Sequence, residues 1–169
     1  PLLYKNLGVD GIKTGFLTVE KYSLASSMMT GERRITAVAS GFPTKNSRSR
    51  ESIKILNWGL RMFDTIQVTK KNEPIVDLYV WLGKKLRVQT YLDEDTYLTV
   101  PKRKKNTIKA IIEYEGPIHA PIKKGDVLGK LNIYLDGELD RQLDIFSYET
   151  IKKANIFSRL VRYFNFLVW

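Results

Sequence analysis

The hydrophobic and polar positions in the first part of the chain predict a pair of strands. Two mostly β-compatible runs, 22–29 and 33–40, are separated by Thr30-Gly31-Glu32, which has the composition of a hairpin turn. We therefore expect the two runs to pair as antiparallel strands.

A helical pattern follows, after Gly41-Phe42-Pro43 breaks the β pattern. Apolar residues then recur at helical spacing and cover one face: Ile53, Leu56, Leu60 and Phe63. This spacing predicts a helix at 46–63 packed on the strand pair, with Trp58 in the core between helix and sheet.

After Asp64 the pattern changes to short runs of β-branched and aromatic residues with Gly, Asp or Pro between them. These runs are approximately 66–70, 75–82, 85–91, 96–100, 107–115 and 127–135, with 139–146 as a candidate seventh. Regular short strands are typical of a small all-β sandwich or barrel. The pattern predicts a domain boundary near residue 64, with domains at 1–64 and 65–151 and with Tyr79 and Trp81 on a strand face of the second.

Residues 152–169 have the pattern of an amphipathic helix. One arc collects the apolar side chains Ile156, Phe157, Leu160, Val161, Phe164, Leu167 and Val168. Such a helix most often docks on its own domain. Three features favour a membrane surface here: Phe and Leu on the apolar arc, a terminal Trp169, and the cations Arg159, Arg162 and Lys152 on the polar arc, which suit anionic headgroups. We therefore predict that the seven apolar residues and Trp169 contact a membrane.

Composition limits the chemistry that the 169 residues can support. The chain has no cysteine, which excludes disulfides, cysteine-ligated zinc and a cysteine nucleophile. Its single histidine, His119, lies between Pro117 and Pro121 without a second metal ligand close in sequence, so we expect a surface histidine and no metal or cofactor. No run of about 20 apolar residues is present, which excludes a spanning helix.

The formal net charge of +10 raises the question of a nucleic-acid partner. The densest basic run is Lys102-Arg103-Lys104-Lys105, which follows Pro101 between two predicted strands. It has no interleaved aromatic residues on which bases could stack. We therefore interpret it as a solvated loop and expect no nucleic-acid partner.

Lys13-Thr14-Gly15 carries the candidate chemistry, although these three common residues alone would suit any exposed turn that enters a strand. An ammonium beside a hydroxyl can hold the terminal carboxylate of a peptide, and a glycine lets a substrate backbone come close. The segment Gly8–Gly59, with Ala39-Ser40-Gly41, resembles the end of the transpeptidase-like domain of penicillin-binding proteins. Two later segments, Trp81-Leu-Gly-Lys-Lys85 and Ala120-Pro-Ile-Lys-Lys-Gly125, resemble the C-terminal domain of the low-molecular-mass D-alanyl-D-alanine carboxypeptidases.

This resemblance implies an α+β chain: the C-terminal piece of a β-lactamase/transpeptidase-like sheet-and-helix domain, then a small all-β sandwich that acts as a stalk, then the amphipathic helix. It also implies a serine carboxypeptidase that removes the terminal D-alanine of peptidoglycan stem peptides and is acylated by β-lactams, at the periplasmic face of the cytoplasmic membrane. Lys13 and Thr14 would bind the substrate's carboxylate, and Gly15 and the backbone N–H of Phe16 would contact its backbone. Leu17 and Glu20-Lys21 depart from the residues that many members carry.

The family's nucleophile motifs are absent from this sequence. No serine has Lys three residues later or Asn two residues later, so Ser-x-x-Lys and Ser-x-Asn do not occur. Because the chain starts at Pro1 and these motifs precede Lys-Thr-Gly in the family, we expect an N-terminal truncation and an inactive fragment. The alternative is a non-catalytic wall-binding or scaffolding module at the membrane surface. A β-lactamase fits less well, because those enzymes end soon after the helix equivalent to 46–63.

Overall fold

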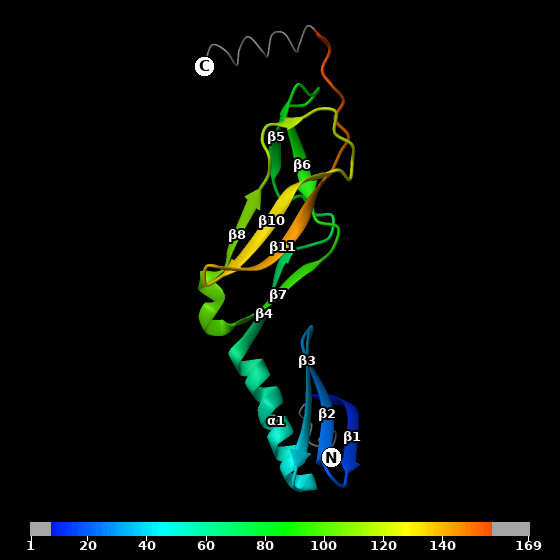
Figure 1. Ribbon diagram of the computed structural model, residues 1–169, viewed down its shortest axis with the longest axis vertical. Coiled ribbons are helices and arrows are strands. Elements are labelled where there is room, and N and C mark those ends of the chain that lie inside the picture. Colours follow the sequence, from blue (N-terminus) through cyan, green and yellow to red (C-terminus); the bar gives the residue numbers. More distant parts are fainter. Residues whose placement is uncertain (1–7, 157–169) are drawn as a thin grey trace. The chain divides into compact units, whose positions relative to one another are not determined.

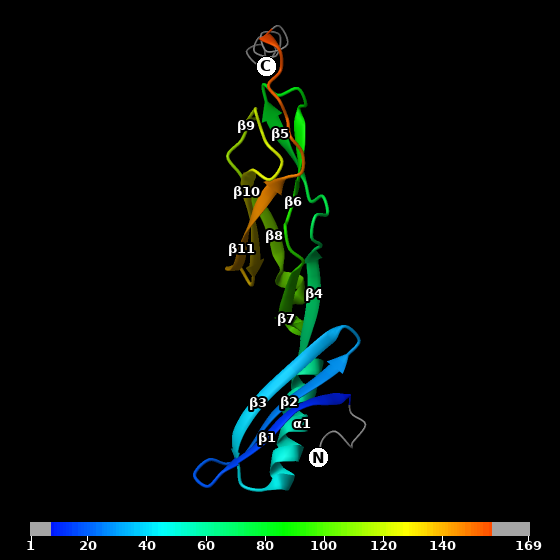
Figure 2. The same cartoon turned by 90° about the vertical axis from the view of Figure 1, so that its right-hand side faces the viewer.

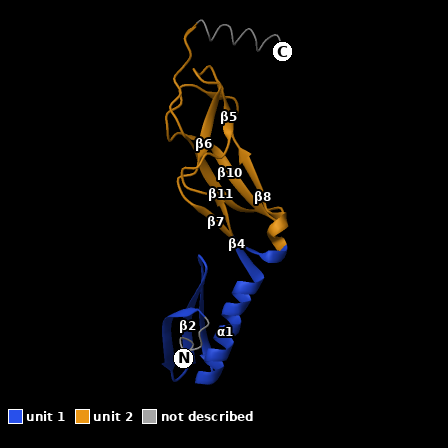
Figure 3. Ribbon diagram, turned by 180° about the vertical axis from the view of Figure 1, so that it is seen from behind, with its two compact units in different colours: residues 1–65, 99–103 blue, residues 66–98, 104–169 orange. Residues whose placement is uncertain are grey.

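The computed structural model describes residues 8–156. The chain forms two compact units (Figure 3): unit 1 comprises residues 1–65 and 99–103, and unit 2 comprises residues 66–98 and 104–169. The fold is β-rich with one substantial helix.

Unit 1 is a three-stranded antiparallel sheet with a helix on one face (Figures 1 and 2). Its strands follow the order β1-β2-β3 and are β1 (Val9–Leu17), β2 (Lys21–Thr30) and β3 (Arg33–Phe42). The predicted hairpin is confirmed, because Thr30 pairs with Arg33 and Gly31 has the positive φ of 59° that a two-residue turn favours.

Helix α1 (Lys45–Met62) confirms the predicted helix. It begins at a capping box in which the Ser47 N–H donates to Thr44 Oγ1 at 3.0 Å and the Thr44 N–H donates to Ser47 Oγ at 3.1 Å. Leu56 is 1% exposed and joins a core cluster with Val9, Leu24 and Met28 of the sheet. Ile35 and Ala37 of β3 pack against the same cluster, so the apolar stripe anchors the helix to the sheet.

Two predictions for this helix are wrong. Trp58 is 57% exposed rather than in the core, because two residues of helix turn its side chain about 200° away from that of Leu56. Phe63 belongs to β4 (Phe63–Thr69) instead of the helix, and its ring meets Trp58 edge-on at 5.0 Å between ring centroids.

Every strand predicted after residue 64 is present. The remaining strands are β5 (Asp77–Trp81), β6 (Arg87–Tyr91), β7 (Thr96–Pro101), β8 (Lys109–Glu113), β9 (Ile118–His119), β10 (Val127–Leu135) and β11 (Glu138–Ser147). Six of these form one sheet in the order β8-β10-β11-β6-β5-β9, and β4 pairs with β7 in a second, two-stranded sheet. The two-residue strand β9 was not predicted.

The strands of unit 2 bury alternate residues. In β5, Leu78 and Val80 are buried while Tyr79 is 47% exposed, so Tyr79 and Trp81 lie on a strand face as predicted. The basic run begins a 3₁₀ helix, η2 (Lys102–Thr107), instead of an irregular loop, and its residues are exposed except for the half-buried Lys104. Lys104 in this helix pairs with Asp136.

The amphipathic helix predicted at 152–169 lies mostly outside the described residues, as do the predicted membrane contacts Phe157, Leu160, Val161, Phe164, Leu167, Val168 and Trp169. Residues 152–155 are not helical, which corrects the predicted start of the helix. Lys153 forms a bridge with Gly83, and the N–H of the buried Ala154 donates to the Leu82 carbonyl at 2.9 Å. Ile156 is described and is 75% exposed. Among the described residues, no helix is long and apolar enough to cross a membrane.

Candidate functional site

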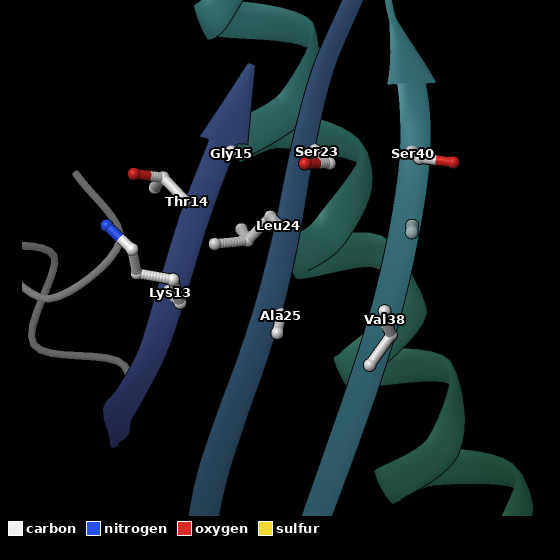
Figure 4. A pocket seen from close by; sticks show the side chains of 9 residues that line it. Lys13, Thr14, Gly15, Ser23, Leu24, Ala25, Val38 and Ser40 are labelled. Atoms are coloured by element: carbon white, nitrogen blue, oxygen red, sulfur yellow. The ribbon is translucent and has the colours of Figure 1, made fainter. Parts of the chain in front are cut away.

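Lys13, Thr14 and Gly15 lie in β1, which is an edge strand of the unit 1 sheet. Within the described part of the chain, β1 pairs only with β2. The side chains of Lys13 and Thr14 are exposed and have no hydrogen-bond or ion-pair partner among the described residues. Figure 4 shows the Lys13 amino group and the Thr14 hydroxyl on the side of β1 that faces away from β2. A donor pair therefore stands at an open strand edge.

A depression of about 350 Å³ extends from this motif across the sheet (Figure 4). All three strands line it, through Lys13, Thr14, Gly15, Ser23, Leu24, Ala25, Val38, Ala39 and Ser40. The strand register pairs Lys13 with Ala25 and Gly15 with Ser23, so small residues stand beside the motif. Most of the other lining residues are also small, and Leu24 and Val38 are the larger ones.

The Ser23 side chain, as it is placed, occupies the space that a side chain at position 15 would need. A Cβ built on Gly15 would lie 2.4 Å from Ser23 Oγ, well inside van der Waals contact. The glycine thus allows β1 and β2 to keep the serine hydroxyl at the floor of the depression.

Phe16 has a side-chain environment distinct from that of the motif. Its ring lies 4.8 Å from the Tyr22 ring, and the Arg48 guanidinium lies 5.7 Å from the Tyr22 ring centroid. The ring is nevertheless 57% exposed. The side chain therefore packs against Tyr22 of β2, and Phe16 is not among the residues that line the depression.

An ion pair that the sequence did not predict ties β1 to β3 near the motif. Arg34 of β3 bonds Asp10 of β1 through two nitrogens, with NH1 at 2.8 Å from Oδ1 and NH2 at 2.7 Å from Oδ2. NH1 also donates to Ser27 Oγ at 2.6 Å. The Arg34 hydrogen bond lowers the pKa of the Asp10 carboxyl and raises the pKa of the guanidinium. Asp10 precedes Lys13 by three residues, so this pair holds the strand that carries the motif.

Neither a metal centre nor His119 contributes to this geometry. Among residues 8–156, no three His, Asp or Glu side chains gather as a metal-binding group. His119 lies in β9 of unit 2 and is exposed. At the β1 edge, the Lys13 ammonium and the Thr14 hydroxyl can bind an anion next to a strand edge that can accept an extended backbone.

Comparisons with known proteins point to one group of enzymes. The family described as "Penicillin-binding protein 5, C-terminal domain" matches residues 63–153. The D-alanyl-D-alanine carboxypeptidase DacA of Escherichia coli K12 is 33% identical over 168 residues, which are 98% of this chain and 42% of the relative. DacF of Bacillus subtilis, also described as a D-alanyl-D-alanine carboxypeptidase, is 32% identical over 92% of this chain and 40% of its own length.

A solved structure agrees with these sequence matches. Penicillin-binding protein 5 from Haemophilus influenzae is similar with a TM-score of 0.76 and 32% identity, over 88% of this chain and 44% of that one. The chain spans about two fifths of the length of the curated relatives it matches.

Proposed function

The chain belongs to the low-molecular-mass penicillin-binding protein family of D-alanyl-D-alanine carboxypeptidases, and we propose that it is the C-terminal part of such an enzyme. The intact protein would remove the terminal D-alanine of peptidoglycan stem peptides through an acyl-enzyme and would be acylated by β-lactams. The observation that carries this proposal is the donor pair of Lys13 and Thr14 at the edge of β1, which has no side-chain partner among residues 8–156 and lies beside a depression lined mostly by small residues.

Recognition of the substrate would begin with its carboxylate. The Lys13 ammonium supplies charge, and the Thr14 hydroxyl supplies a directed hydrogen bond. The substrate backbone would then lie along the free edge of β1 as an added strand, where Gly15 leaves space and the Phe16 N–H is a candidate donor to the developing oxyanion. The Asp10–Arg34 ion pair supports this role, because it holds β1 against the neighbouring strands.

The nucleophile would come from residues outside this sequence, since neither Ser-x-x-Lys nor Ser-x-Asn occurs in it. In the proposed reaction the serine oxygen attacks the carbonyl of the penultimate D-alanine, and the terminal D-alanine leaves as the free amino acid. Water then cleaves the resulting ester and regenerates the serine. The 169 residues contribute substrate binding rather than bond-making groups.

Attachment to the periplasmic face of the cytoplasmic membrane is a further part of this proposal. It rests on the sequence of residues 156–169, whose apolar arc begins at the exposed Ile156. In a deletion test the chain should end at Asn155, because the bridge of Lys153 and the buried Ala154 belong to unit 2. Loss of binding to neutral phosphatidylcholine vesicles is the expected result, and unchanged binding to these vesicles would contradict this attachment.

Fluorescent penicillin tests the enzymatic proposal in the full-length protein. We expect a covalent label that disappears when the serine of an upstream Ser-x-x-Lys is replaced by alanine. A folded full-length protein that takes up no label would refute the proposal. If no upstream Ser-x-x-Lys were present either, that result would favour a wall-binding or scaffolding module.

A further inference from the structure

Three segments that are distant in sequence meet at one end of unit 2, beyond β5 and β6 (Figures 1 and 2). They are residues 82–86, 122–126 and 148–154. The Lys84 N–H donates to the Lys152 carbonyl at 2.8 Å, and Ile122 and Ile151 form a two-way bridge with N–O distances of 2.9 and 2.8 Å. Backbone hydrogen bonds therefore hold the three segments together.

Each of these segments carries a pair of adjacent lysines, all of them exposed. We name the group Lys84, Lys85, Lys123, Lys124, Lys152 and Lys153 the lysine collar. The three segments contain only two carboxylates, Asp126 and Glu149, so they hold a formal excess of four positive charges out of the +10 of the whole chain. The folded chain thus concentrates charge that is dispersed in the sequence.

Most of the collar's charge is available to a partner. Lys85 is paired with Glu149, and the Lys124 ammonium lies 5.6 Å from the Tyr148 ring centroid. Within the described part of the chain, the side chains of the other four lysines have no hydrogen-bond or ion-pair partner. The carboxylate of Asp126 accepts a hydrogen bond from the Lys123 backbone N–H at 2.7 Å.

We propose that the lysine collar is a second membrane-contacting surface, which binds the phosphate groups of anionic phospholipids. Lysines on flexible stems suit a fluid array of phosphates, because such an array offers charge without fixed geometry. Two exposed apolar side chains accompany the collar, Leu86 at 47% and Ile156 at 75% exposure. Apolar groups beside lysines match a bilayer interface, where acyl chains lie below charged headgroups.

The position of the collar also favours a bilayer. Lys152 and Lys153 directly precede the segment proposed to attach to a membrane, so attachment by residues 156–169 would bring the collar to the same surface. The inference rests on this proposed attachment and is independent of the proposed enzymatic activity. The two membrane contacts differ in lipid dependence, because the collar responds to anionic lipid whereas the apolar arc also partitions into neutral bilayers.

The test measures partitioning of the full 169-residue chain onto sedimented vesicles. Vesicles of phosphatidylcholine alone are compared with vesicles of equal parts phosphatidylcholine and phosphatidylglycerol. The collar variant is K84Q/K123Q/K152Q/K153Q, which changes only exposed side chains. The control variant K102Q/R103Q/K105Q/K109Q removes the same charge at the basic run and β8. A third variant, K84R/K123R/K152R/K153R, keeps the charge of the collar.

Each lysine near an anionic surface strengthens partitioning by about fivefold. On the anionic vesicles we expect the partition coefficient of the collar variant to be lower than that of the parent chain by at least about tenfold. This difference should become smaller as the salt concentration rises, because salt screens the charges. The control should lose less than about threefold, and the arginine variant should bind like the parent chain. On neutral vesicles, all four proteins should bind equally.

Equal losses for the collar and control variants on anionic vesicles would overturn the inference, because only net charge would then matter. Unchanged binding of the collar variant there would also overturn it. A different result would show that the proposed tail attachment fails: the chain ending at Asn155 would bind neutral vesicles as strongly as the full chain. Neither result depends on whether the intact protein is labelled by penicillin.

Discussion

Replacement of Gly15 with alanine tests the packing beside the motif. The new Cβ would lie 2.4 Å from Ser23 Oγ, at least 1 Å closer than the ordinary contact range of 3.4–4 Å. Because Ser23 Oγ is the end of a side chain that can rotate, the clash forces an unfavourable rotamer rather than a backbone shift. We expect a destabilisation of about 0.5–1.5 kcal/mol, measured by amide hydrogen exchange in β1 and β2.

The double variant G15A/S23A isolates this contact. With Oγ removed, the next atom is Ser23 Cβ at 3.8 Å from the new methyl group, an ordinary contact. Gly15→Ala should therefore lower the free energy of unfolding only slightly when position 23 is also alanine. The coupling energy between the two positions should then be close to the destabilisation caused by Gly15→Ala alone. If Gly15→Ala destabilised the protein equally with serine and with alanine at position 23, the contact with Ser23 would not be the cause of the destabilisation. In the full-length protein, penicillin acylation should be slowed in both variants, because the methyl group occupies the depression even where folding is restored.

Two further predictions concern the support of the site. Leu56→Ala should destabilise unit 1 by about 2–5 kcal/mol, because Leu56 is 1% exposed in the core, whereas Ile55→Ala should destabilise it by less than about 1 kcal/mol, because Ile55 is 40% exposed. Denaturant unfolding measures both variants, and similar losses of stability would contradict the assigned helix face. The Asp10–Arg34 ion pair should stabilise the sheet above the ordinary aspartate pKa of 3.8 and lose that effect as the pH falls through the lowered pKa of folded Asp10. The amide signals of β1, followed as the pH is lowered, should show this loss of stability in the parent chain and lack it in Asp10→Asn. The same pH dependence in both proteins would contradict a stabilising Asp10–Arg34 ion pair.

Local signals were sufficient for most elements. The helical spacing around Leu56 predicted α1, and Gly31 between two β-compatible runs predicted the hairpin, because both depend on contacts within a few residues. Trp58 is not a core residue, although it is large and apolar, because its angular position on the helix turns it away from the buried face. The two-residue β9 was missed because its pairing with β5 leaves no periodic pattern in so short a run.

Long-range geometry explains what the sequence could not predict at the functional surfaces. Lys13 and Thr14 were identifiable as a motif, but the short side chains that open the depression come from β2 and β3 through the strand register. Arg34 was one residue of a predicted strand, and only the sheet brings it to Asp10. The lysine collar likewise joins three dipeptides that are separated by more than two dozen residues each. The domain boundary near residue 64, the binding roles of the motif and the membrane contacts remain predictions.

Carboxylate recognition by Lys13 and Thr14 can be tested with a substrate whose C-terminal carboxylate is replaced. Hydrolysis of a D-alanyl-D-alanine peptide by the full-length protein is compared with that of the same peptide bearing a C-terminal amide, for the parent and for K13A/T14V. We predict that the parent prefers the carboxylate and that the variant loses a preference worth about 1.5–3 kcal/mol, as for hydrogen bonds to a charged group. An unchanged preference for the acid over the amide in the variant would contradict carboxylate recognition by Lys13 and Thr14.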